Sequence, residues 1–294
     1  MENLRGIVWM VAAMGGFALE DMFVKKVATV LPVGQILVII GGGGAAVFAA
    51  WALARGERLF APVMFTRAMA IRNAGEAFGT LLFVTAISLA PLSVVSAILQ
   101  ATPLAVTLGA AVFLGAPVGW RRWAAILVGF AGVLMVVQPG AAGFKPEALF
   151  AVGAVVGLAA RDLATRVAPA AVSTQILSAW GFAMAALAGV ALLPFGAGPA
   201  MPDAATAGRL AGALACGVVG YYAITAAMRV GEVAVVTPFR YTRLVFALAI
   251  GVMVFGEQPN VLTLAGAAVI IASGLYTLWR ERQAAPLSPG PVNR

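Results

Sequence analysis

The sequence has no histidine, a single cysteine and few charged residues, which make up 10% of its 294 residues. The one cysteine, Cys216, excludes disulfides within the chain and thiolate metal clusters. Histidine is the commonest proton relay and metal ligand, so without it any proton coupling would depend on carboxylates. Water-soluble domains usually have about 25% charged residues, so the composition excludes a soluble protein.

Sequence motifs of other functions are absent too. The chain has no H-E-x-x-H, G-x-S-x-G or cysteine–histidine set, so we predict no enzyme, no metal site and no cofactor. It has no Walker A sequence, which excludes an ATP-driven pump. The net charge of +8 is spread among short loops, so no nucleic acid partner is predicted.

The sequence is instead dominated by apolar runs. Hydrophobic residues make up 62% of the chain, and the mean hydropathy is +1.00. The runs are about 20 residues long and do not alternate with period two, which favours helices over a β-barrel. We predict an all-α membrane protein whose first run is retained, with ten transmembrane helices near residues 5–28, 33–54, 70–89, 92–114, 120–138, 146–166, 170–193, 206–228, 233–255 and 260–279.

Prolines separate these runs. Most lie at span boundaries or in loops, where a missing N–H costs little, and only Pro103 and Pro238 lie inside spans. An interior proline frees a carbonyl and kinks the helix. The two breaks are either static kinks or the helix interruptions that many transporters use.

Lysines and arginines are distributed unequally between the two sides of the membrane. With the N-terminus inside, 13 of the 19 are cytoplasmic, four lie at the other face and two lie within the membrane. This bias predicts that both termini are cytoplasmic. The proline-rich ending, residues 283–294, is predicted to be a disordered tail.

The two halves of the chain resemble each other. Asp21 aligns with Asp162 and Lys25 with Arg166, both at an offset of 141 residues, and FLGAPVGWRRWAAILVGFAG aligns with VFGEQPNVLTLAGAAVIIASG. Each half then has five spans, so the second half enters the membrane upside down. We predict two inverted five-helix domains, 1–140 and 141–282, an architecture of secondary transporters with a site near the midplane.

The ninth span has two arginines near the bilayer midplane. At ~1.5 Å per residue from the start of the span, Arg240 lies roughly 12 Å deep and Arg243 roughly 16 Å deep in a core of about 30 Å. Guanidiniums at this depth are costly unless they face partners or a wet cavity. The equivalent first-half positions are Leu99 and Thr102, so this charge belongs to the second half alone. We predict that the arginines bind a substrate carboxylate or pair with Glu76; the alternative is a static ion pair.

The residues TPFRYTRLVFALAIGVMVFGEQPNVLTLAGAAVIIASG, from Thr237 to Gly274, resemble the second-repeat signature of the drug/metabolite transporter superfamily, in its ten-span EamA-type branch. The stretch from Ala86 to Gly115 is similar to the first repeat, although Ala116 stands where the family usually has glutamate. The resemblance covers almost the whole chain. It implies a central cavity lined by spans one, three, four, six, eight and nine.

The resemblance also implies a function. We expect a secondary transporter in the bacterial inner (plasma) membrane that exports small metabolites by alternating access, with aromatic or other apolar amino acids as first candidates. The alternatives are an exporter of drugs or other metabolites, and a membrane assembly subunit that does not transport. The expected partners are the substrate and the lipid bilayer, and the protein is expected to be a monomer or a weak homo-oligomer.

Several further side chains are candidates for substrate binding. Glu76 either pairs with Arg72, one helical turn earlier, or offers a cavity carboxylate to a substrate amine. Gln100 lies beside the break at Pro103, where it either satisfies freed backbone groups or contacts substrate. Aromatic residues on spans three, eight and nine form an apolar pocket wall if they face the cavity, and pack against lipid or core otherwise: Phe78, Phe83, Tyr221, Tyr222, Phe239 and Tyr241.

Two acid–base pairs one helical turn apart are also predicted, namely Asp21 with Lys25 and Asp162 with Arg166. They are either structural pairs near the span ends or parts of gates that open and close as the halves rock. Their neighbours Glu20 and Arg161 are candidates for the same gates.

Overall fold

The computed structural model of the protein describes residues 2–116, 119–140, 145–166, 172–196, 198–230 and 233–284. The predicted tail lies almost entirely outside these residues. The elements are α1 (Glu2–Val27), α2 (Val33–Ala54), η1 (Pro62–Phe65), α3 (Arg67–Leu89), α4 (Leu92–Leu99), α5 (Thr102–Phe113), α6 (Trp120–Val137), α7 (Ala148–Arg166), α8 (Thr174–Leu192), η2 (Leu193–Phe195), α9 (Ala204–Val230), α10 (Val233–Val236), η3 (Thr237–Tyr241), α11 (Thr242–Phe255) and α12 (Val261–Ala284).

The elements correspond to the ten predicted spans, with two spans divided. The fourth span consists of α4 and α5, and the ninth of α10, η3 and α11. Pro103 lies in the first turn of α5 and Pro238 in the first turn of η3. Proline suits a first helical turn, because the N–H that it lacks has no partner there. Both predicted helix breaks are therefore present.

The third span is the most polar of the ten. Within the described residues, nine stretches are long and apolar enough to cross a membrane, and they match the predicted spans apart from α3. Helix α3 has 23 residues but carries Arg67, Arg72, Asn73 and Glu76 in its first half. Three of these four side chains face the protein interior, because Arg72, Asn73 and Glu76 are buried, while Arg67 at the start of the helix is exposed. A span that hides its charges from lipid need not be uniformly apolar.

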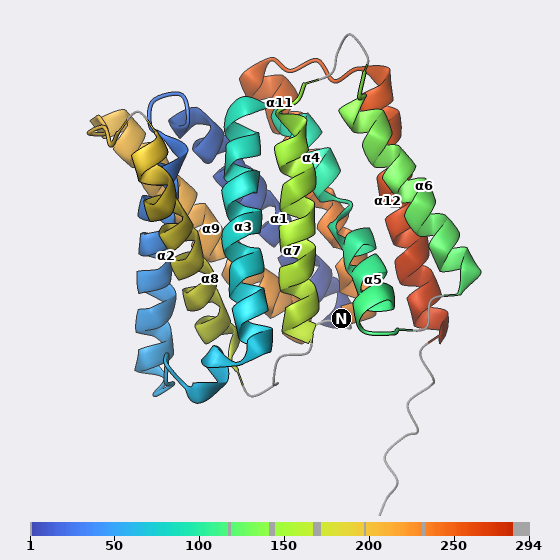
Figure 1. The fold of residues 1–294 in the computed structure, drawn as a ribbon, viewed down its shortest axis with the longest axis horizontal. Helices are drawn as coiled ribbons and strands as arrows, with labels where there is room; N and C mark the ends of the chain where they lie inside the picture. Colours follow the sequence, from blue (N-terminus) through green and yellow to red (C-terminus); the bar gives the residue numbers. More distant parts are fainter. Residues whose placement is uncertain are drawn as a thin grey trace, which may run out of the picture.

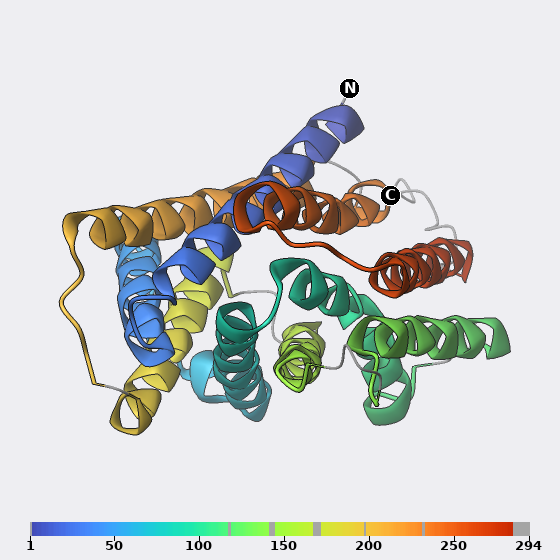
Figure 2. The same ribbon diagram turned by 90° about the horizontal axis from the view of Figure 1, so that it is seen from above.

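Each helix of the first half packs against one of the second half. The most extensive contacts join α1 with α9, α2 with α8, α3 with α7, and α6 with α12, while α4 packs on α11. These pairs lie side by side in both views of the ribbon (Figures 1 and 2). The first and third spans of each half exchange partners, and the other spans meet their own equivalents. This pairing is the one that a twofold relation between the repeats produces.

The two halves run through the bundle in opposite directions. In Figure 1, α1 runs upward from the N-terminus, whereas α7, the first span of the second half, runs downward. The beginning of α1 and the end of α12 both lie at the lower end of the bundle in that view. We call this the lower end, and the opposite one, where α3 connects to α4 and α11 to α12, the upper end. Which end faces the cytoplasm stays a prediction.

Glycines allow the closest contacts between the halves. Gly157 of α7 and Gly79 of α3 approach so closely that a Cβ on Gly157 would lie 2.7 Å from the Gly79 Cα and N atoms. Backbone atoms cannot move aside as a flexible side chain can. Small residues at such contacts are typical of helices packed within membranes.

We expect Gly157→Ala to separate α3 from α7 and to destabilise the protein by about 1–3 kcal/mol, the usual cost of overpacking. Gly208→Ala on α9 is the matched control, because nothing lies within 4 Å of a Cβ at that position. Alanine favours a helix by roughly 1 kcal/mol over glycine, so this control is expected to be neutral or slightly stabilising. Thermal unfolding of both variants in detergent measures the difference. Equal melting temperatures would contradict the close contact.

Candidate functional site

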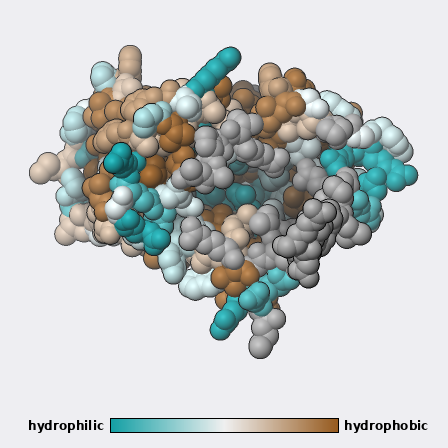
Figure 3. Space-filling view, turned by 90° about the horizontal axis from the view of Figure 1, so that it is seen from below, coloured by the Kyte–Doolittle hydropathy of each residue, from teal (hydrophilic) through white to brown (hydrophobic). Residues whose placement is uncertain are grey.

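A cavity of about 280 Å³ lies between the two halves, near the middle of the bundle. Viewed from below, the molecule is hollowed near its centre, and hydrophilic residues are visible inside the hollow (Figure 3). Residues of both halves line the cavity, and its polar or aromatic members include Phe17, Glu20, Glu76, Thr80, Phe83, Arg161, Phe182, Tyr221, Arg240 and Arg243. The helices α2 and α8 also contribute, so spans two and seven line the cavity in addition to the six expected.

Arg243 is held by Asp21. Its Nη2 atom donates to both carboxylate oxygens of Asp21, at 2.9 and 2.7 Å, and its Nε donates at 3.2 Å. The guanidinium also lies over the rings of Phe17 and Phe83, at 5.5 and 5.3 Å from their centroids. Asp21 is only 3% exposed. The arginine therefore has a fixed partner inside the membrane, which removes much of its cost.

This pair corrects two predictions. Asp21 does not pair with Lys25, although the two lie one turn apart, and Arg243 does not pair with Glu76. The reason is that Asp21 faces α11 across the helix interface, where a bidentate partner is available. Lys25 points to the upper end, where its Nζ donates to the carbonyls of Ile87 and Ala90 and lies 3.9 Å from Glu257.

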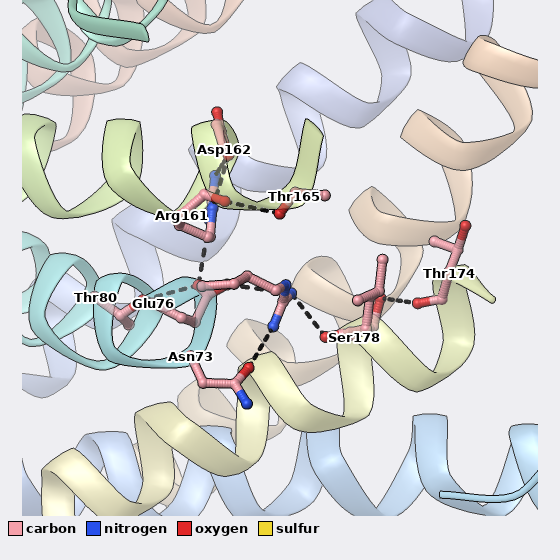
Figure 4. A network of polar contacts seen from close by, with 10 residues as sticks. Asn73, Glu76, Thr80, Arg161, Asp162, Thr165, Thr174 and Ser178 are labelled. Atoms are coloured by element: carbon pink, nitrogen blue, oxygen red, sulfur yellow. Dashed lines mark hydrogen bonds and ion pairs between the residues drawn. The ribbon is translucent and has the colours of Figure 1, made fainter. Parts of the chain in front are cut away.

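Glu76 lies at the centre of a second polar network, between α3, α7 and α8 (Figure 4). Its Oε1 accepts from Arg161 Nη1 at 3.2 Å and from Thr80 Oγ1 at 3.2 Å, and its Oε2 lies 3.6 Å from Arg72 Nη2. The predicted turn-to-turn pair with Arg72 is thus present. Arg72 is anchored further because Nη2 donates to the Leu177 carbonyl at 2.8 Å.

Asp162 has a partner that was not predicted. It accepts from Arg161 Nε at 2.8 Å, so Arg161 bridges Asp162 and Glu76. The side chain of Arg166 lies outside the described residues, and its predicted pairing stays a prediction. Arg161 lines the cavity but contacts Glu76, not Glu20, so the predicted gate between Glu20 and Arg161 is not formed in this conformation.

Two charged side chains of the cavity have no partner among the described residues. Arg240 is exposed and lines the cavity, and no described carboxylate lies within 4.0 Å of it. Glu20 lines the same cavity, and no described side chain forms a hydrogen bond or ion pair with it. Both belong to elements that meet at the cavity, since α1 contacts η3. The cavity thus offers one guanidinium and one carboxyl group that no described side chain binds.

An aromatic wall borders these charges. Tyr221 packs edge-on against Phe17, with ring centroids 5.7 Å apart, and lies 5.4 Å from Phe182. Phe182 stacks on Phe48 at 5.7 Å. Sequence reasoning identified Tyr221 but missed Phe17 and Phe182, because phenylalanines in apolar helices give no signal of the direction they face.

The other predicted binding residues lie outside the cavity lining. Phe78 and Tyr222 are 52% and 47% exposed on the outer surface, since the helical periodicity turns them away from their neighbours that face inward. Phe239 packs against the cluster of Met10 and Ala13. These corrections follow from side-chain direction, which the span assignment alone does not give.

Gln100 and Tyr241 contact each other where the two broken spans cross. Gln100 Nε2 donates to the Tyr241 carbonyl at 3.2 Å, and the two residues are 141 positions apart, so they occupy equivalent places in the repeat. Tyr241 is 6% exposed, and its hydroxyl lies where a side chain on Gly274 would be. Gln100 thus bonds the backbone of the other broken span, and its contact with substrate stays a prediction.

Comparisons with known proteins agree with this architecture. The model of the EamA-like transporter family matches residues 4–138 and again 145–279. The riboflavin transporter of Rhizobium johnstonii is 30% identical over 209 residues, covering 70% of this chain and 68% of that protein. The S-adenosylmethionine uptake transporter of Rickettsia bellii is 26% identical over 211 residues, covering 70% of each. A crystal structure of another protein has a TM-score of 0.57 and 21% identity over 91% of this chain and 98% of that chain, which shows the fold.

The family model thus matches both halves separately, and the two matches together span nearly the whole chain. Its two copies agree with the repeat seen in the sequence and with the helix pairing in the structure. The chain belongs to the EamA-like transporter family.

Proposed function

We propose that this protein is a secondary transporter whose central cavity binds a zwitterionic small metabolite, with an amino acid bearing an aromatic or apolar side chain as the first candidate. One observation supports this substrate class above all. The cavity presents a guanidinium, Arg240, and a carboxyl group, Glu20, that form no hydrogen bond or ion pair within the described residues, beside an aromatic wall.

The charges suit a zwitterion for an energetic reason. An uncompensated charge within a membrane protein is costly, and a ligand of opposite charge removes that cost when it binds. The guanidinium of Arg240 has the fork geometry that binds a carboxylate with two hydrogen bonds. Glu20 is an acceptor for an ammonium group. The other charged side chains at the cavity already form ion pairs, Arg243 with Asp21 and Arg161 with Glu76. These pairs shape the cavity and leave Arg240 and Glu20 for the substrate.

The cavity also limits the size of the substrate. Its volume of about 280 Å³ is near the lower bound of ligand pockets, roughly 300–1,000 Å³. An aromatic amino acid fits within it, with its ring on the wall formed by Phe17, Phe182 and Tyr221.

S-adenosylmethionine is the second candidate. It carries the same amino and carboxylate groups and an aromatic base, and a relative from Rickettsia bellii is named for its uptake. It is larger than an amino acid, so it would need the cavity to widen. Riboflavin, the substrate in the name of another relative, has no ammonium group to match Glu20.

For the transport cycle we propose alternating access between two inverted repeats, residues 1–140 and 141–282, with both termini in the cytoplasm and the protein in the bacterial inner membrane. Export remains our prediction for the direction of net transport. The broken spans cross at the cavity, where rocking of one half against the other would change which end is open.

The proposal predicts substrate flux without ATP. Purified protein in liposomes is expected to exchange radiolabelled phenylalanine or tyrosine down a gradient, and unlabelled S-adenosylmethionine competes if it shares the site. Liposomes containing the Arg240→Ala variant are the control for leakage. If neither amino acids, S-adenosylmethionine nor riboflavin moves, the alternative of a membrane assembly subunit gains support and the transport proposal fails.

A further inference from the structure

We propose that Glu257 is a latch that closes the upper end of the transporter, and that Ala116, at the matching position of the lower end, cannot form the same contacts. Glu257 is then a positioning residue that sets which end of the cavity is open at rest. This inference rests on the proposed transport by alternating access.

Glu257 joins the second half to the first through several contacts. Its Oε1 accepts from the Leu92 backbone N–H at 2.6 Å, and its Oε2 accepts from the N–H and the hydroxyl of Ser93, at 2.9 and 2.6 Å. Leu92 and Ser93 begin α4, where backbone N–H groups have no partner within the helix. A carboxylate at this position is favoured by hydrogen bonding and by the helix dipole.

Lys25 adds a third element to the latch. Its Nζ lies 3.9 Å from Glu257 Oε1 and donates to the carbonyls of Ile87 and Ala90 at the end of α3, at 3.2 and 2.5 Å. The side chains of Lys25 and Glu257 are 16% and 9% exposed. The latch therefore ties α1, the α3–α4 junction and the α11–α12 junction together.

The backbone presents Glu257 to α4. Helix α11 ends at Phe255 and is capped by Gly256, which has a φ of +63°, a left-handed conformation that favours glycine. The N–H of Glu257 donates to the Gly251 carbonyl at 2.9 Å, so the residue is fixed on the helix end. The Glu257 side chain therefore extends toward α4 from a backbone that is held in place.

The repeat shows what the lower end lacks. Shifted by 141 residues, Glu257 corresponds to Ala116, Ser93 to Ala234 and Lys25 to Arg166. The lower end keeps the base in its sequence but has alanine in place of the carboxylate at this position, and a methyl group cannot accept a hydrogen bond. The hollow seen from below lies at this unlatched end (Figure 3). The asymmetry therefore favours a conformation that is closed above and open below.

The distance across each end tests the latch without any substrate. In a Cys216→Ser background, one spin-label pair at Leu89 and Val261 reports the upper end, and another at Phe113 and Val230 reports the lower end; all four residues are exposed. Pulsed electron paramagnetic resonance gives the distance distribution of each pair. We expect Glu257→Gln to raise the fraction with a long upper distance about ten-fold, because a charged acceptor is lost.

Two further variants make the test specific. Glu147→Gln changes a carboxylate on the loop before α7 that has no partner among the described side chains, and it is expected to leave both distances unchanged. Ala116→Glu adds the missing acceptor and is expected to shorten the lower distance, a change that misfolding would not produce. Ser93→Ala removes one donor and is expected to act like a weaker Glu257→Gln.

The latch is overturned if Glu257→Gln leaves the upper distribution as in the wild type, or if Ala116→Glu leaves the lower one unchanged. These results are independent of flux. Shifted distances together with no flux would reject the proposed substrate and keep the latch, whereas normal flux with unshifted distances would reject the latch alone.

Discussion

Replacing Arg240 with alanine is expected to reduce substrate flux at least ~10-fold at low substrate concentration while leaving the protein folded. Flux falls because the substrate carboxylate loses its charge-assisted hydrogen bonds. The fold is kept because Arg240 is exposed to the cavity and makes no ion pair within the described residues. Uptake of labelled amino acid into liposomes measures the first effect, and thermal unfolding in detergent measures the second.

Two variants control this prediction. Arg240→Lys keeps the charge but not the fork geometry, and is expected to retain part of the flux. Arg121→Ala removes an exposed arginine that stacks on Trp120, away from the cavity, and is expected to transport normally. If Arg240→Ala transports like the wild type, the proposed carboxylate site is wrong.

Replacing Arg243 with alanine is expected to affect stability first and to destabilise the protein by about 3–5 kcal/mol. The change would leave Asp21, which is 3% exposed, as an unpaired charge inside the membrane. The sequence alone predicted that Arg243 binds a substrate carboxylate or pairs with Glu76, with a static ion pair as the alternative, and the bidentate pair with Asp21 is such an ion pair. Thermal unfolding beside Arg240→Ala measures the difference.

A double variant separates a broken pair from a lost side chain. Asp21→Asn combined with Arg243→Gln replaces two charges with neutral groups that still form hydrogen bonds, so most of the stability is expected to return. A double variant as unstable as Arg243→Ala would show that packing of the guanidinium on Phe17 and Phe83 matters more than the charge of Asp21.

Much of the fold follows from patterns that need no tertiary information. Apolar runs mark the spans, because a helix in lipid must hide its backbone and expose apolar side chains. Pro103 and Pro238 mark the broken helices, because proline removes an N–H and clashes with the preceding turn. Residues that match at an offset of 141 positions show the repeat, and counting spans gives five in each half.

Only part of the candidate site could be predicted from sequence patterns. Arg240, Arg243, Glu76 and Tyr221 were identified because charged and polar aromatic residues are conspicuous in an apolar span, and all four line the cavity. Glu20 was noted only as a neighbour of Asp21. Phe78 and Tyr222 were placed wrongly because the composition of a span does not say which face meets the cavity.

The sequence by itself determined the membrane character, the division into spans, the helix breaks and the charge that only the second half carries. The tertiary structure alone decided the partners. Asp21 and Arg243 are 222 positions apart, and Ser93 and Glu257 are 164 apart. A sequence shows only pairs one helical turn apart, such as Asp21 with Lys25, whereas packed helices offer each carboxylate several donors. Each carboxylate pairs with the donor that it reaches with good geometry in a dry interface. Asp21 pairs with Arg243, and Arg240 is left for a substrate.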